Sequence, residues 1–89
     1  MNTPLPVIHM NGTSRETLVS EYKAALDSVR EATDALARVT VNGRDYYPLG
    51  DRAIYEALDE HWKHRKALHD VADHLGRVLW HLTDSEAAR

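Results

Sequence analysis

Two long stretches of helical apolar periodicity constrain the fold of this chain more than any other feature. In each, the residues recur in steps of four and three, the spacing of one helix face. The first series is Leu18, Tyr22, Ala25, Val29, Ala32, Leu36 and Val39, with Leu26 widening the stripe. The second is Ile54, Leu58, His61, Arg65, Leu68, Ala72, Leu75, Leu79 and Leu82. The pattern predicts an all-α fold.

Capping and breaking signals predict where the two helices begin and end. Thr13 and Glu16 have the spacing of a capping box, and Asp51 is a natural N-cap for the second helix. Three β-branched residues at 39–41, followed by an Asn42-Gly43 step that tolerates positive φ, favour an end to the first helix. We therefore expect helices over about 14–40 and 52–82, joined by a connector at 41–50.

The same signals divide the chain into three parts. Pro4 and Pro6 favour an extended leader over residues 1–12, and the polar residues 84–89 are expected to fray. Between them, the helical domain at 13–83 should fold back as an antiparallel hairpin, with each helix roughly 40 Å long at about 1.5 Å per residue. Gly76 inside the second helix costs about 1 kcal/mol relative to alanine and indicates a close helix contact.

A single hairpin of this length leaves each helix supported on one side only. The chain has 89 residues, and a core this small rarely stabilises a fold by more than about 3–5 kcal/mol. Several apolar residues also lie outside the main seams: Leu26, Tyr55, Trp62, Val71, Val78 and Trp80. We therefore expect self-association into a helical bundle, a homo-oligomer that is at minimum a four-helix dimer.

Composition excludes several classes of site. The chain has no cysteine, which removes disulfides and thiolate chemistry. No apolar run approaches the roughly 18 residues needed for a membrane span, and no signal peptide is recognisable at the start, so a cytoplasmic location is expected. A net charge of −3 with interspersed signs disfavours nucleic-acid binding, although the basic run from His61 to Lys66 keeps that partner as a minor alternative.

The first candidate binding segment precedes and opens the first helix: Asn11, Gly12, Thr13, Ser14 and Arg15. A helix N-terminus offers free backbone N–H groups and the positive end of the helix dipole to an anion. Gly12 permits close backbone approach, the hydroxyls donate, and Arg15 adds a cation. The alternative is an ordinary helix cap, in which Glu16 occupies one donor and repels anions.

The second candidate lies in the connector, where Arg44, Tyr46 and Tyr47 precede Pro48. Tyrosine faces stack on nucleobases, and an adjacent arginine holds phosphate. Pro48 is expected to keep Tyr47 extended, so that the two tyrosines point in different directions. The alternative is that the tyrosines plug the open end of a bundle while Arg44 and Asp45 form a local ion pair.

The third candidate is a polar interruption of the second seam by His61 and Arg65, with Trp62 beside them. In the expected hairpin this stretch faces residues 27–30, so Asp27 is the predicted partner of a buried Arg65. Together with Glu60 and His64 the cluster could line a cavity for an anionic ligand. It could equally set the register of the bundle, as polar seam residues do in coiled coils.

Catalysis and metal binding find little support in the pattern. His61 with His64 and Asp70 with His74 have helical spacing, but a metal site without cysteine needs three or four such ligands converging. There is no nucleophile elbow, no Walker-type phosphate loop and no evident acid/base pair of carboxylates. We therefore expect no enzyme, no metal and no cofactor.

Two motifs carry a resemblance. His9–Glu16 reads His-x-Asn-Gly-Thr-Ser-Arg-Glu, and residues 42–50 read Asn-Gly-Arg-Asp-Tyr-Tyr-Pro-x-Gly. With these, most of residues 8–80 resembles small proteins encoded in tailed-phage genomes, which implies a viral protein acting in the host cytoplasm. In architecture alone the chain is also similar to phage sponge proteins that sequester the cyclic-nucleotide signals of antiviral defence.

Two hypotheses of function follow. In the first, a non-catalytic oligomer sequesters a phosphate-bearing, nucleotide-like ligand at subunit interfaces, where the N-terminal and connector segments of antiparallel subunits could meet. In the second, a small viral inhibitor or adaptor docks on a host protein through Tyr46, Tyr47, Trp62 and Trp80, since aromatic residues dominate interface hot spots. A virion or packaging component is a third reading.

Overall fold

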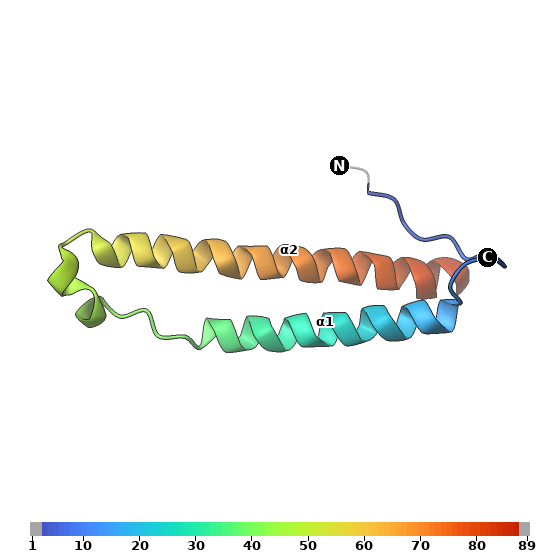
Figure 1. The fold of residues 1–89 in the computed structure, drawn as a ribbon, viewed down its shortest axis with the longest axis horizontal. Helices are drawn as coiled ribbons and strands as arrows, with labels where there is room; N and C mark the ends of the chain where they lie inside the picture. The colour runs from blue at the N-terminus through green and yellow to red at the C-terminus, as the bar shows by residue number, and fades with distance from the viewer. Residues whose placement is uncertain (1–2, 88–89) are drawn as a thin grey trace.

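The computed structural model describes residues 3–87 and the side chains of residues 3–84. Its elements in chain order are helix α1 (Arg15–Ala37), two short 3₁₀ turns η1 (Gly43–Asp45) and η2 (Tyr47–Leu49), and helix α2 (Ala53–Ala87). Every regular element in this described range is helical (Figure 1). The expected all-α class is therefore confirmed.

The two long helices lie side by side and run in opposite directions, with the connector at one end and the leader at the other (Figure 1). The molecule is a rod with extents of 61 × 25 × 23 Å. Its radius of gyration is 18.9 Å, whereas a compact chain of this length would have about 12 Å. Such a shape leaves most of each helix circumference open to solvent.

Helix α1 begins one residue later than the capping-box interpretation implied. Ser14 is the N-cap, and its hydroxyl accepts a hydrogen bond from the Thr17 amide at 3.2 Å. The predicted Thr13–Glu16 box is therefore wrong, because Thr13 lies one position outside the helix. At the other end α1 ends at Ala37, three residues before the predicted end at about residue 40, and the amides of Arg38 and Val39 bond three residues back to tighten the last turn.

The connector is a folded turn. Asn42 accepts a hydrogen bond from the Arg44 amide at 3.0 Å, which begins η1. The Asn42-Gly43 step, which tolerates positive φ, does not adopt it; in the described part of the chain positive φ occurs at Gly50, with φ of 111°. Because side chains disfavour that region, glycine is required at position 50 to turn the chain into α2.

Helix α2 differs from its expected bounds at both ends. The Glu56 amide bonds to the Arg52 carbonyl at 3.1 Å, so Arg52 rather than Asp51 accepts the first helical bond. At the other end α2 continues to Ala87, five residues beyond the predicted end. Residues 83–87 contain neither glycine nor proline to stop a helix, and the Thr83 hydroxyl bonds back to the Leu79 carbonyl at 2.9 Å. Within the predicted 84–89 tail, residues 88 and 89 lie outside the described range.

The buried core is small and follows the second predicted seam more closely than the first. Val78 is 1% exposed, Leu82 2% and Leu26 4%, and within residues 3–84 these are the fully buried side chains. Leu26 and Val78 had been placed off the main seams, whereas Ala25, Ala32 and Val39 of the predicted ridge are exposed. On α2 the predicted row faces inward, since all its members except Leu58 are half-buried or buried. On α1 the row is turned slightly, so that Leu26 and Thr33 face inward in place of Ala25 and Ala32.

The leader packs against the end of α2. Residues 3–9 have no regular secondary structure, as expected. The His81 Nε2 atom lies 2.9 Å from the Pro6 carbonyl oxygen, and since a carbonyl only accepts, this nitrogen donates. This contact brings Leu5 to the last turns of α2.

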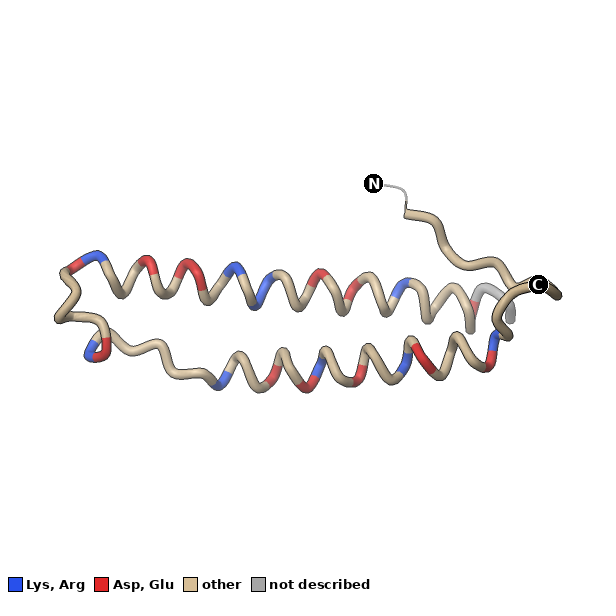
Figure 2. Tube along the Cα trace, viewed as in Figure 1, with Lys and Arg blue, Asp and Glu red and all other residues tan. Residues whose placement is uncertain are grey.

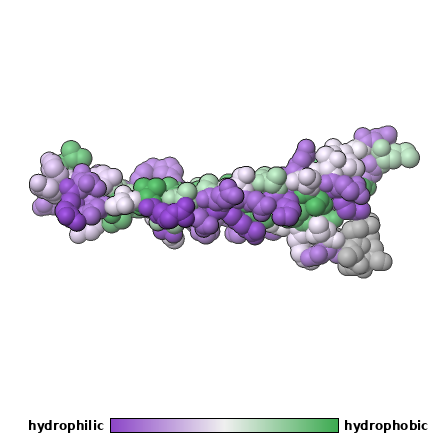
Figure 3. Space-filling view, turned by 90° about the horizontal axis from the view of Figure 1, so that it is seen from below, coloured by the Kyte–Doolittle hydropathy of each residue, from purple (hydrophilic) through white to green (hydrophobic). Residues whose placement is uncertain are grey.

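The helix surfaces carry charges of both signs along their length (Figure 2). Among the described side chains, ion pairs between residues four apart on one helix include Lys23–Asp27, Asp59–Lys63 and Lys66–Asp70, and Glu60 contacts His64 at the same spacing. Apolar patches interrupt this polar surface (Figure 3). In residues 3–87 neither helix combines the length and apolar character needed to cross a bilayer.

The burial pattern predicts which leucines hold the fold together. Leu26→Ala should lower the free energy of unfolding by about 2–5 kcal/mol, because it removes buried methyl groups and leaves a cavity. Leu49→Ala makes the same chemical change at an exposed position and should cost less than about 0.5 kcal/mol. Urea unfolding at one fixed protein concentration measures both, and equal losses would contradict the assigned core.

Candidate functional site

The structure does not bring the three predicted segments together in one chain. The segment from Asn11 to Arg15 lies where α1 begins, and the connector lies at the opposite end of the rod (Figure 1). His61, Trp62 and Arg65 lie on α2 between these ends. A ligand contacting two of the segments would have to bind across more than one copy of the chain.

The N-terminal segment is occupied largely with its own backbone. The Gly12 amide bonds to the His9 carbonyl at 3.1 Å, closing a turn, and the His9 ring covers Gly12. A Cβ at Gly12 would lie 2.9 Å from the His9 Nε2 atom. Ser14 caps the helix and also donates to the Thr17 hydroxyl at 2.9 Å. These contacts favour the capping interpretation of this segment.

The two tyrosines of the connector differ in how exposed their side chains are. Tyr46 is half-buried between η1 and η2, whereas Tyr47 is 75% exposed. Tyr47 opens η2 with Pro48 at its second position, so the expected extended backbone at Tyr47 is wrong. The local ion pair expected between Arg44 and Asp45 is also missing from the described side chains. Arg44 is exposed, and its amide is bound by Asn42.

The α2 segment carries a buried polar atom without a partner. Arg65 is half-buried, and its Nε atom has no hydrogen bond to any described residue. Asp27 instead pairs with Lys23 at 3.2 Å, so the predicted Arg65–Asp27 pair is wrong. The register explains this, because Arg30 lies beside Ala72 and Gly76 of α2 rather than beside residues 61–66. Trp62 next to this segment is 60% exposed.

Neighbouring charges on α2 are satisfied within the helix. Asp59 accepts from Lys63 at 3.0 Å, and this hydrogen bond, with the negative charges of Asp59 and Glu60, raises the pKa of the Lys63 ammonium. Glu60 contacts His64 at 2.9 Å, and Lys66 bonds Asp70 at 3.1 Å. Because these groups already have partners, they are less available than Arg65 for hydrogen bonds to a ligand.

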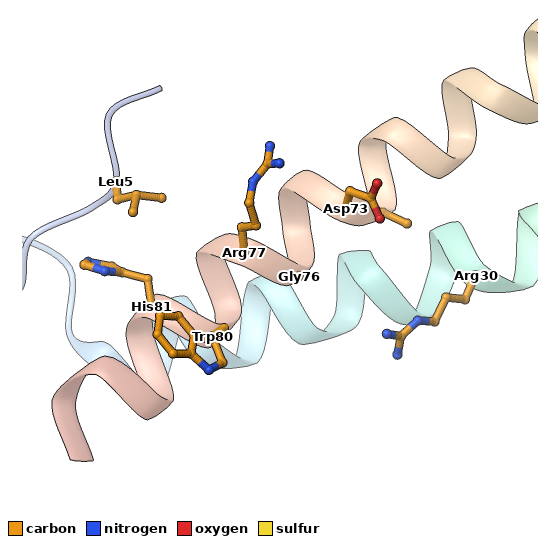
Figure 4. A pocket seen from close by; sticks show the side chains of 8 residues that line it. Leu5, Arg30, Asp73, Gly76, Arg77, Trp80 and His81 are labelled. Carbon is orange, nitrogen blue, oxygen red and sulfur yellow. The ribbon is translucent and has the colours of Figure 1, made fainter. Parts of the chain in front are cut away.

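A hollow near the end of α2 went unpredicted. It has a volume of about 480 Å³ and draws residues from the leader, α1 and α2 (Figure 4). Its lining residues are Leu5, Arg30, Ala72, Asp73, Gly76, Arg77, Trp80 and His81. A Cβ at Gly76 would meet nothing within 4 Å, so the expected close helix contact there is wrong and the glycine instead leaves open space.

The hollow combines free cations with an exposed aromatic ring. Within residues 3–84, Arg30 and Arg77 make no side-chain hydrogen bond or ion pair, and Trp80 is 61% exposed. The Arg30 side chain extends along α1 in the direction of Trp80 (Figure 4). Guanidinium groups bind phosphate oxygens in pairs of hydrogen bonds, and an indole face stacks on a planar base. Asp73 adds one negative charge to the same wall.

The sequence holds one signal for this hollow, the spacing of Gly76 and Trp80, but it is not sufficient to predict the lining. Gly76 and Trp80 are four residues apart and share a helix face, which marks a small residue beside a large exposed one. The contributions of Leu5 and Arg30 depend on where the leader packs and on the helix register. Periodicity specifies neither of these.

No metal centre is indicated by the described side chains, among which no three His, Asp or Glu residues gather. Comparisons of the chain with protein-family models, with curated proteins and with solved structures gave no match.

The position of the N-cap gives a direct test of the first segment. Ser14→Ala should lower the free energy of unfolding by about 1 kcal/mol, because the Thr17 amide loses its acceptor. Thr13→Ala removes the same kind of hydroxyl one residue earlier and should be nearly neutral. Thermal unfolding followed by circular dichroism compares the two variants. A larger loss for Thr13→Ala would restore the capping-box interpretation.

Proposed function

We propose that this chain is a non-catalytic binding protein that captures a phosphate-bearing, nucleotide-like ligand. Two-helix hairpins of this kind would associate into an oligomeric bundle, with the ligand held at the subunit boundary. The observation that carries the proposal is the hollow near the end of α2, whose lining includes exposed Trp80 together with Arg30 and Arg77, two arginines that have no hydrogen-bond or ion-pair partner among the described side chains.

The chemistry of the hollow matches the two parts of such a ligand. Arg30 and Arg77 provide donors for phosphate oxygens, and hydrogen bonds to charged groups contribute about 1.5–3 kcal/mol each. Trp80 provides a stacking surface, which contributes about 1–3 kcal/mol per base. The volume of about 480 Å³ falls within the roughly 300–1,000 Å³ typical of small-molecule pockets.

The location of the site differs from the one predicted from sequence. The eleven candidate residues (Asn11, Gly12, Thr13, Ser14, Arg15, Arg44, Tyr46, Tyr47, His61, Trp62 and Arg65) do not line the hollow. Arginine beside an aromatic residue was nevertheless the chemistry expected, and it recurs here with different residues. The resemblance to phage proteins makes signalling nucleotides of the host the class to examine, with host cytoplasm as the place of action.

A thermal-shift screen tests ligand capture directly. Cyclic di- and trinucleotides and ADP-ribose derivatives are the compounds to use, each at a hundredfold excess over micromolar affinity. A compound that binds only the folded chain should stabilise it by about 2.7 kcal/mol at that excess. If every compound leaves the melting midpoint unchanged, the proposal is wrong.

Replacing the arginines locates the site. For any compound that binds, Arg30→Gln and Arg77→Gln should each weaken affinity at least tenfold, because each removes a charged donor worth about 1.5–3 kcal/mol. Arg38→Gln is the matched control, since it removes the same charge from the end of α1, outside the hollow. Titration calorimetry measures all three, and equal weakening by the control would mean that only net charge matters.

A second candidate function, an inhibitor or adaptor of a host protein, is favoured by the tip of the connector. Tyr47 and Leu49 are both strongly exposed on η2, where two 3₁₀ turns and Gly50 hold the backbone in place. An apolar pair presented on an ordered turn is a suitable anchor for a partner pocket.

Affinity capture from host lysate distinguishes this candidate from ligand capture. It predicts one stoichiometric partner that is lost when Tyr47 and Leu49 are both changed to serine. Changing the equally exposed Val7 of the leader to serine should leave that partner bound. Loss of the partner with both variants would assign the contact to general surface hydrophobicity.

A further inference from the structure

One face of α2 remains uncovered along most of its length. Its members are Leu58, Trp62, Arg65, His69, Asp73, Gly76 and Trp80. They lie 4, 7 and 11 residues to either side of His69, and these spacings place them on a single helix face. Leu58, Trp62 and Trp80 are exposed despite being large and apolar. We call this surface the His69 face.

The His69 face is complementary to itself. Trp62, with its large side chain, lies seven residues before His69, and Gly76, with open space beside it, lies seven residues after. Four residues before and after lie Arg65 and Asp73, which have opposite charges. Eleven residues before and after, Leu58 and Trp80 are both exposed and apolar. In an antiparallel pair of identical helices related by a two-fold axis at His69, a residue that lies a given number of positions before His69 faces the residue that lies the same number of positions after His69 in the partner.

We propose that a second copy of the chain docks on the His69 face, α2 against α2, with a two-fold axis at His69. The partner's Trp62 then covers the hollow beside Gly76, and Arg65 meets the partner's Asp73. A twisted or shifted pairing would lose at least one of these matches.

Within one chain, Arg65 and Asp73 have no ion-pair partner among the described side chains. The Arg65 Nε atom is buried with no hydrogen bond, and Asp73 makes no ion pair with any described side chain. At Gly76 nothing lies within 4 Å of where a Cβ would be, so an approaching indole meets no obstruction there. A carboxylate delivered from outside would pair with the Arg65 guanidinium at its terminal nitrogens, and a large aromatic ring would fill the space at Gly76. A copy of the same face carries both at the required spacing.

The second copy would also complete the proposed ligand site. The partner's Trp62 would supply a second aromatic surface over the hollow, opposite Trp80, while Arg30 and Arg77 stay in the wall. In this respect the inference rests on the proposed function and deepens it. The pairing of the two helices does not itself require a ligand, so the two proposals fail independently.

Cross-linking tests the axis, because the chain contains no cysteine of its own. Packed helices have axes about 8–10 Å apart and Cα atoms about 2.3 Å from each axis, so facing Cα atoms at the axis come within about 5 Å. That separation suits a disulfide. His69→Cys should therefore convert most of the chain to a covalent dimer under mild oxidation at micromolar concentration.

Ala67→Cys is the matched control, since residue 67 is exposed on the opposite side of the same helix. It should cross-link at least tenfold more slowly than His69→Cys. Equal rates for the two variants, or a 10.1 kDa particle for the unmodified chain in sedimentation at micromolar concentration, would overturn the pairing.

Charge reversal tests the register of the same pairing. Asp73→Arg places like charges opposite Arg65 and should raise the dimer dissociation constant at least tenfold, with helix content unchanged by circular dichroism. Asp45→Arg makes the same change in the connector and should have no effect. Adding Arg65→Glu to Asp73→Arg should restore association, and a helical double variant that stays monomeric would contradict the register. If the dimer forms but no nucleotide shifts its melting midpoint, the interface stands and the proposed function fails.

Discussion

Burial between α1 and α2 is the constraint on which the rest of this structure depends, and there is little of it. Leu26, Val78 and Leu82 are its fully buried members in residues 3–84, two of them near the end of α2 where the leader also packs. Burying such a side chain contributes about 1.5–3 kcal/mol. With so few of them, the remaining apolar surface of both helices stays available for other contacts.

Other interactions in the chain shape it more than they stabilise it. The i,i+4 ion pairs Lys23–Asp27, Asp59–Lys63 and Lys66–Asp70 lie on exposed surface, where water and salt screen the attraction and leave it little net effect on stability. Ser14, Asn42 and Gly50 determine where the elements begin and turn. They therefore position the two ends of the rod, while its stability depends on burial within the chain and, as proposed above, between copies.

The hollow and the His69 face have a common origin in this shortage of packing. Gly76 has no side chain to fill the space beside Trp80, and α1 contributes only Arg30 at that point. The same open space that could accept a ligand is the space that the partner's Trp62 would cover. Ligand capture and self-association are thus separate proposals about one surface.

Sequence alone determined the helical class, the approximate helix bounds and the expectation of exposed aromatic residues, because these follow from local periodicity, capping and glycine placement. Tertiary structure decided which row of α1 faces α2, so that Leu26 became core and Ala25 and Ala32 did not, and it added Val78 to the predicted row of α2. It also decided that Arg30 lies beside Gly76 and that Asp27 does not reach Arg65. The physical reason is that a helix with a wide apolar arc can rotate and slide against its neighbour at little local cost, so register is set by the sum of contacts along the whole pair.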